Sequence, residues 1–151
     1  TGDVKDLEGT VGDHDDVSSR VRCVVDFFGP TDLTKMAAQS GPNSKMDHDS
    51  PTSPESRLVG GPIQQNKEKA ARANPAAFAT KDDAPVLILH GDADPLVPLG
   101  QSELLRDALK KAGVEVELVV IKGGGHGGAG FATKENQDKI AAFLDKHLKQ
   151  K

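Results

Sequence analysis

The sequence predicts an α/β fold, with three parallel strands in one sheet and helices flanking it. Three short runs of β-branched and large apolar residues alternate with segments that have the composition of helices. This alternation is typical of parallel sheets joined by right-handed crossovers. A length of 151 residues suits one domain, so we expect residues 1–151 to form a single domain.

The first predicted strand runs from Val21 to Phe28 and is bounded by Gly29-Pro30. Its β-branched and aromatic composition favours a strand buried on both faces. Residues 1–20 before it form a polar, acidic arm without an apolar period. Residues 38–62 after it are rich in Ser, Pro, Gly and Asp, which indicates a long irregular insertion.

Two further strands are predicted at Val86 to His90 and at Val116 to Ile121. Helices are predicted around them from helix formers, caps and stop signals. They cover Gln65 to Ala73, the amphipathic segment Gln101 to Ala112, and Lys134 to Lys149, for which Thr133 is the candidate N-cap.

Composition and charge exclude several functions. The net charge is −4 at pH 7 and no basic stripe is present, so binding to nucleic acid has no electrostatic support. No run of about 18 apolar residues exists that could span a membrane. The single cysteine, Cys23, excludes an internal disulfide and a cysteine-based zinc finger.

Two histidines raise the alternative of a metal- or anion-binding module. His14 and His48 each lie among aspartates, and such imidazole and carboxylate groups can bind a metal. Their spacing matches no metal signature, and a solvated acidic loop is the favoured interpretation of both. We therefore expect no metal and no cofactor.

Polar residues follow the last two predicted strands, where a parallel sheet places its functional loops. Asp94 follows the second strand, and His126 follows the third within a glycine-rich loop. Neighbouring strands lie about 5 Å apart, so the two loops can meet. A carboxylate there can fix the tautomer of an imidazole and stabilise its charged form. The order Asp then His is that of hydrolases whose triad runs Ser, Asp, His.

Other residues near these loops compete for the same roles. Asp92 is the alternative acid, but Asp94 precedes Pro95 and is favoured, and we interpret Asp92 as a turn residue. His90 ends a predicted strand and is interpreted as structural. Alone, His126 or Asp94 could be a simple turn residue, but their placement after successive strands favours catalysis.

Four motifs resemble the α/β-hydrolases, and in particular the acyl-esterase branch related to feruloyl and acetyl-xylan esterases, near prolyl oligopeptidase and dienelactone hydrolase. The segments 90–98 and 125–128 are similar to the acid and histidine loops of α/β-hydrolases, whereas 24–32 and 53–60 resemble the esterase branch. The resemblance implies an esterase fold with Asp94 as triad acid and His126 as base.

The nucleophile of that family is missing from these residues. No serine stands in a Gly-x-Ser-x-Gly elbow, and no His-Gly-Gly oxyanion segment is present. The resemblance therefore implies the C-terminal part of the fold. Cys23 lies within a strand, where an apolar setting would not activate it, and Ser102 lies on a helix expected to pack away from the cleft.

Two main hypotheses follow. In the first, the chain is part of a serine hydrolase that acts on carboxylic esters, and a second chain or a lost segment carries the Gly-x-Ser-x-Gly serine. In the second, the chain is a non-catalytic module that forms a homodimer through the exposed edge of its first strand.

Overall fold

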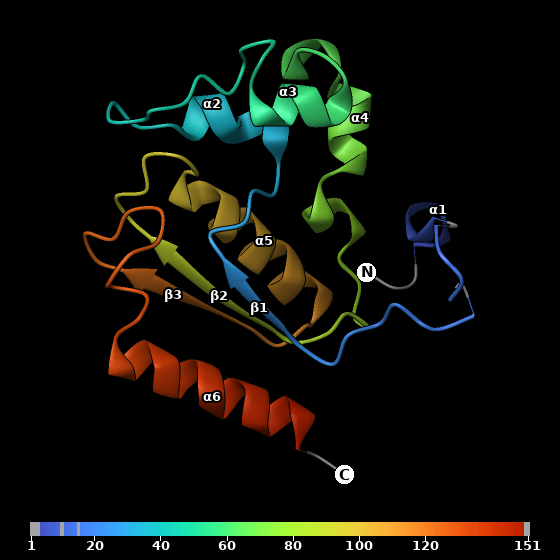
Figure 1. Ribbon diagram of the computed structural model, residues 1–151, viewed down its shortest axis with the longest axis vertical. Helices are drawn as coiled ribbons and strands as arrows, with labels where there is room; N and C mark the ends of the chain where they lie inside the picture. The colour runs from blue at the N-terminus through green and yellow to red at the C-terminus, as the bar shows by residue number, and fades with distance from the viewer. Residues whose placement is uncertain (1–3, 10, 15, 150–151) are drawn as a thin grey trace.

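The computed structural model describes residues 4–9, 11–14 and 16–149, and its core is one parallel sheet (Figure 1). The strands β1 (Val24–Phe27), β2 (Val86–Gly91) and β3 (Val116–Ile121) are ordered β1-β2-β3. Val86 of β2 pairs with Val24 on one side and with Val116 on the other. The predicted three-stranded parallel sheet is confirmed.

Helices connect and cover these strands. The α-helices are α1 (Lys5–Glu8), α2 (Met36–Gln39), α3 (Pro54–Val59), α4 (Lys67–Arg72), α5 (Leu99–Ala112) and α6 (Lys134–Leu148), and the short 3-10 helices are η1 (Leu33–Lys35), η2 (Ile63–Gln65) and η3 (Pro75–Phe78).

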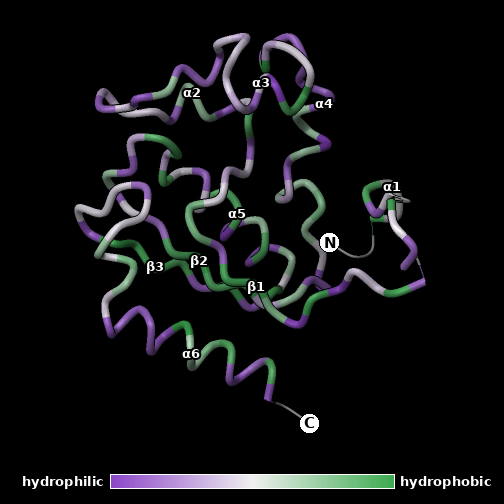
Figure 2. The backbone as a smooth tube through the Cα atoms, in the orientation of Figure 1, coloured by the Kyte–Doolittle hydropathy of each residue, from purple (hydrophilic) through white to green (hydrophobic). Residues whose placement is uncertain are grey.

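Helices α5 and α6 lie on opposite faces of the sheet, which gives three layers (Figure 1). Leu109 of α5 packs against Val86 and Ile88, whereas Phe143 of α6 packs with the cluster around Leu87. Strand β2 is buried along its whole length because both of its faces are covered and both of its edges are paired. The tube coloured by hydropathy shows the same pattern, with the apolar colour concentrated in the strands (Figure 2).

The segment between β1 and β2 rises above the carboxyl ends of the strands and has a small core of its own (Figure 1). Leu33, Val59, Ile63 and Ala70 form this core. The expectation of an irregular insertion over 38–62 is wrong at α3, a helix with a complete set of local signals. The Ser53 side chain accepts the Ser56 N–H, a proline follows at the first helical positions, and Gly60 ends the helix in the left-handed conformation.

Strand β1 differs from the expectation of burial on both faces. Val24 and Phe27 are 36% and 41% exposed, because β1 pairs with β2 only and lies at the edge of the sheet. The amides of Val24 and Phe28 donate to carbonyls of the β2 segment. The amides of the alternate residues, Val25 and Phe27, therefore point away from the sheet.

None of the helices within residues 4–9, 11–14 and 16–149 combines the length and the apolar character needed to cross a bilayer.

Candidate active site

The loop after β2 holds Asp94 in a closed backbone turn. Asp94 Oδ1 accepts the N–H groups of Leu96 at 2.8 Å and of Val97 at 2.9 Å. The Asp94 side chain is fully buried. An aspartate that bonds backbone amides two and three residues onward fixes its own turn, so the direction of its second oxygen is set locally.

The loop after β3 brings His126 towards Asp94 because glycines let two backbones touch. A Cβ atom built on Gly91 would lie 2.2 Å from the carbonyl oxygen of Gly124, a distance that no side chain tolerates. The residues after His126, Gly127 and Gly128, have φ angles of 90° and 97°, which favour glycine. Close backbone approach and positive φ angles thus explain why glycines occupy these positions in the two loops.

Asp94 and His126 form a hydrogen-bonded pair. Asp94 Oδ2 lies 2.8 Å from His126 Nδ1, and the imidazole side chain is 31% exposed. Since a carboxylate only accepts, Nδ1 carries the proton and the other ring nitrogen is left to accept one in the neutral ring. Such a pair can take a proton from a nearby hydroxyl and stabilise the resulting charge.

Phe28 completes the surroundings of His126, a contact that the sequence does not predict. Its ring centroid lies 4.1 Å from that of His126, and its φ of 47° places a non-glycine residue in the left-handed region. A strained backbone at the end of β1 directs this ring at the imidazole. The sequence carries no direct signal for this φ, although Phe28 immediately precedes Gly29-Pro30.

The interpretations of Asp92 and His90 fit the structure. Asp92 Oδ1 accepts the N–H of Gly123 at 2.6 Å, which ties the acid loop to the histidine loop. His90 is fully buried, with Ser102 Oγ at 2.6 Å from its Nδ1 and the Val97 carbonyl at 2.8 Å from its Nε2. Both residues therefore have structural contacts.

The two nucleophile candidates, Ser102 and Cys23, have surroundings other than the Asp94–His126 pair. The Ser102 hydroxyl is buried on α5 and contacts His90 rather than His126. Cys23 is a free, partly buried thiol just before β1. Within the part of the chain that the structure describes, no hydrogen bond joins a serine to the His126 ring.

The two aspartate-flanked histidines lie apart from this pair. His14 is exposed in the N-terminal arm. His48 is 2% exposed, and its Nδ1 lies 2.9 Å from Glu55 Oε1 on α3. Among residues 4–9, 11–14 and 16–149, no three His, Cys, Asp or Glu side chains group in a way that could hold a metal ion.

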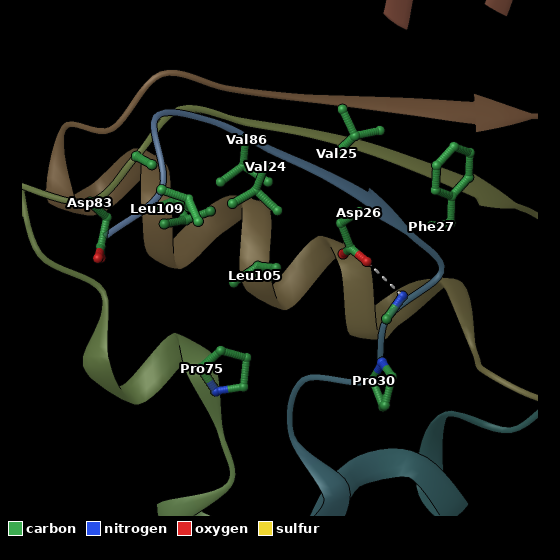
Figure 3. Close-up of a pocket in the computed structure, with 13 residues that line it drawn as sticks. Val24, Val25, Asp26, Phe27, Pro30, Pro75, Asp83, Val86, Leu105 and Leu109 are labelled. Carbon is green, nitrogen blue, oxygen red and sulfur yellow. Dashed lines mark hydrogen bonds between the residues drawn. The ribbon is translucent and has the colours of Figure 1, made fainter. Parts of the chain in front are cut away.

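The edge of β1 borders an apolar groove of about 350 Å³ (Figure 3). Val24 and Asp26 lie on the α5 side of β1, and Leu105, Leu109 and Pro75 face them. Burial raises the pKa of the Asp26 carboxyl above its ordinary value, although its oxygen accepts the N–H of Gly29 at 3.1 Å. The groove therefore contains two carboxyl groups, those of Asp26 and Asp83, in otherwise apolar surroundings.

Comparison with solved structures places the fold of this chain among the α/β-hydrolases. A truncated form of a carbohydrate esterase from gut microbiota aligns over 95% of this chain and 48% of its own, with a TM-score of 0.83 and 31% identity. A bifunctional GH43-CE protein of Bacteroides eggerthii aligns over 93% of this chain and 17% of its own, with a TM-score of 0.82 and 34% identity. The esterase Est2 of Thermogutta terrifontis aligns over 93% of this chain and 47% of its own, with a TM-score of 0.63 and 26% identity.

The chain has the α/β-hydrolase fold and is similar in structure to these esterases. The BD-FAE family model matches residues 1–109, so the chain belongs to the BD-FAE family. Asp94 lies within the matched residues and His126 lies beyond them.

Curated relatives match shorter stretches. The uncharacterized peptidase YuxL of Bacillus subtilis (strain 168) is 33% identical over 88 residues, which are 56% of this chain and 13% of that protein. Acyl-protein thioesterase 1 of Gibberella zeae is 37% identical over 67 residues, 44% of this chain and 27% of that protein. The chain thus spans less than a third of the length of either curated relative.

Proposed function

We propose that this chain supplies the acid and the base of a serine-type carboxylic ester hydrolase, with Asp94 as the acid and His126 as the base. The observation that carries the proposal is the 2.8 Å contact between Asp94 Oδ2 and His126 Nδ1. It joins a buried carboxylate to a partly exposed imidazole at the carboxyl ends of adjacent parallel strands. This is the arrangement that orients a general base towards a substrate.

In the proposed reaction, His126 Nε2 takes the proton of a serine hydroxyl as its oxygen attacks the acyl carbon. The proton then passes to the leaving alcohol, and the acyl group stays on the serine. Water, deprotonated by the same nitrogen, releases the carboxylic acid and restores the serine. Asp94 stays ionised throughout and stabilises the imidazolium.

The nucleophile and the oxyanion donors come, in this proposal, from residues outside these 151. The sequence contains no Gly-x-Ser-x-Gly, and Ser102 faces His90. The missing serine is carried by a second chain or by a further segment of the same polypeptide. Carbohydrate esters are the substrates to test first, because one of the most similar structures is a carbohydrate esterase.

The test compares Asp94→Asn with Asp92→Asn in these 151 residues together with the chain or segment that carries the serine, using an acetylated oligosaccharide and a short-chain aryl ester. We expect Asp94→Asn to lower kcat by about 10⁴-fold, because an amide no longer favours the productive tautomer. Asp92→Asn keeps the oxygen that accepts from Gly123 and should change kcat by less than about threefold. Full activity of Asp94→Asn contradicts the assignment.

A second candidate function is self-association through the β1 edge. The exposure of Val24 and Phe27 and the outward amides of β1 favour it, since an unpaired apolar edge can pair with another strand. In that case the chain forms a concentration-dependent homodimer that Phe27→Lys dissociates, as light scattering would measure. A monomer at all concentrations, or a dimer that Phe27→Lys leaves intact, contradicts this candidate.

A further inference from the structure

The buried contacts behind Asp94 point to two more residues with a part in the reaction. We infer that His90 and Ser102 are positioning residues that hold Asp94 in place for His126. The inference rests on the proposed function, because the position of Asp94 affects catalysis only if His126 is the base.

His90 is locked by hydrogen bonds on both sides of its ring. Nε2 lies 2.8 Å from the carbonyl oxygen of Val97, and a carbonyl only accepts, so Nε2 carries a proton. Nδ1 of the neutral ring then accepts from the Ser102 hydroxyl at 2.6 Å. The Ser102 hydroxyl thus selects the tautomer that donates to Val97.

Val97 connects this ring to Asp94. Its carbonyl accepts from His90, and its amide donates to Asp94 Oδ1 at 2.9 Å. Asp94 Oδ2, the oxygen that contacts His126, also lies 3.5 Å from His90 Nε2. A proton at that nitrogen faces the carboxylate with positive partial charge, so the selected tautomer suits both neighbours.

Ser102, His90 and Asp94 resemble a catalytic triad in composition but cannot act as one. All three side chains are buried, so no substrate can reach the Ser102 hydroxyl. The proton on His90 Nε2 is engaged by the Val97 carbonyl. The arrangement therefore keeps Asp94 in place and performs no acyl transfer.

The experiment compares Ser102→Ala with Thr133→Ala in the purified protein. Thr133 caps α6, far along the chain from Asp94, by accepting the N–H of Asn136. Both variants lose one buried or capping hydroxyl and are expected to lose stability of the same order. The Thr133→Ala control therefore separates general destabilisation from misplacement of Asp94.

The first readout is the His126 Nδ1 proton in the NMR spectrum, assigned by its absence in His126→Ala. We expect Ser102→Ala to move this resonance upfield and to raise its exchange rate with water about tenfold, with no change in Thr133→Ala. The second readout is ester hydrolysis, where we expect kcat to fall about tenfold and KM to stay within twofold.

An unchanged His126 resonance in folded Ser102→Ala overturns the inference, even if the melting temperature falls. If Ser102→Ala cannot be purified, His90→Asn is used, because its amide can still pair with Ser102 while the donor to Val97 is lost. It is judged by the same resonance.

The NMR readout does not depend on turnover. Absence of esterase activity when the serine-bearing chain or segment is present contradicts the proposed function, while the resonance still decides whether His90 and Ser102 hold Asp94.

Discussion

Two histidine–carboxylate pairs in this chain have nearly the same length and different surroundings. His126 and Asp94 are 2.8 Å apart, and His48 and Glu55 are 2.9 Å apart. The His126 side chain is 31% exposed, whereas that of His48 is 1% exposed. Both pairs therefore have a short contact, and they differ in how far solvent can reach the imidazole.

The carboxylates differ as well. Asp94 has backbone donors on Oδ1 and His126 on Oδ2, so both oxygens have partners. Glu55 Oε2 and His48 Nε2 are buried without a hydrogen-bond partner. A pair with a fixed carboxylate and an open imidazole can transfer protons, and a closed pair contributes to the packing of its segment. Four predictions test this contrast, from the largest expected effect to the smallest.

The largest effect is expected when each imidazole is removed in turn. His126→Ala should lower kcat/KM by about 10⁴-fold with little loss of stability, because its ring is partly exposed. His48→Ala should leave kcat/KM within about threefold and lower the free energy of unfolding by about 3 kcal/mol, since Glu55 is left buried without its partner. Ester kinetics and urea unfolding measure both quantities, and the reverse pattern would refute the contrast.

The second prediction concerns a backbone change that affects the Asp94–His126 pair and leaves the His48–Glu55 pair unchanged. Gly91→Ala places a Cβ atom against Gly124, which pushes apart the loops of Asp94 and His126. We expect a loss of about 100-fold in kcat and about 1–3 kcal/mol in stability.

The control for this change is Gly113→Ala. Gly113 has a φ of 84° and no neighbouring atoms within 4 Å of an added Cβ, so alanine strains the backbone alone. The expected cost is about 1–2 kcal/mol with unchanged kcat. Equal losses of kcat in both variants would show that stability, not loop contact, limits the activity.

The third prediction concerns Phe28, whose ring lies against His126 of the open pair and also packs against Phe131. Phe28→Leu keeps most of the apolar volume and removes the ring that lies 4.1 Å from His126. We expect kcat to fall about fivefold, with a melting temperature within about 4 °C of the parent. A rate equal to that of the parent protein would show that this ring does not orient the imidazole.

The smallest effect is expected at Asp26, a partly buried carboxyl whose hydrogen bond comes from the Gly29 N–H rather than from an imidazole. Because burial raises its pKa, the folded protein binds this proton more tightly than the unfolded chain. Stability from this group is therefore lost as the pH rises from its ordinary value of 3.8 through the raised value. Asp26→Asn should flatten this decline in thermal unfolding curves between acidic and neutral pH. An unchanged slope would assign the decline to other groups.

Much of the fold could be predicted because its signals are local. Helix α6 starts after Thr133, whose side chain caps it as expected, and β2 is the compact apolar run that the sequence contains. The proximity of Asp94 and His126 is predictable because the loops after neighbouring parallel strands meet at one edge of the sheet, whatever the directions of their side chains.

The remaining features depend on contacts between distant segments. Helix α3 has six residues, too few to display a period, and its core partner Leu33 comes from another segment. The exposure of β1 depends on which strands pair with it, and the contact of Phe28 with His126 joins segments that lie far apart in the sequence. Periodicity carries no information on these contacts.

The most direct test of the central assignment is covalent labelling of the purified protein with a serine-directed phosphonate, followed by mapping of the labelled peptide. We expect the label on a serine outside these 151 residues, at a rate that His126→Ala lowers at least about 1,000-fold and His48→Ala leaves unchanged. A label on Ser102, or labelling that continues at the parent rate in His126→Ala, would contradict the account.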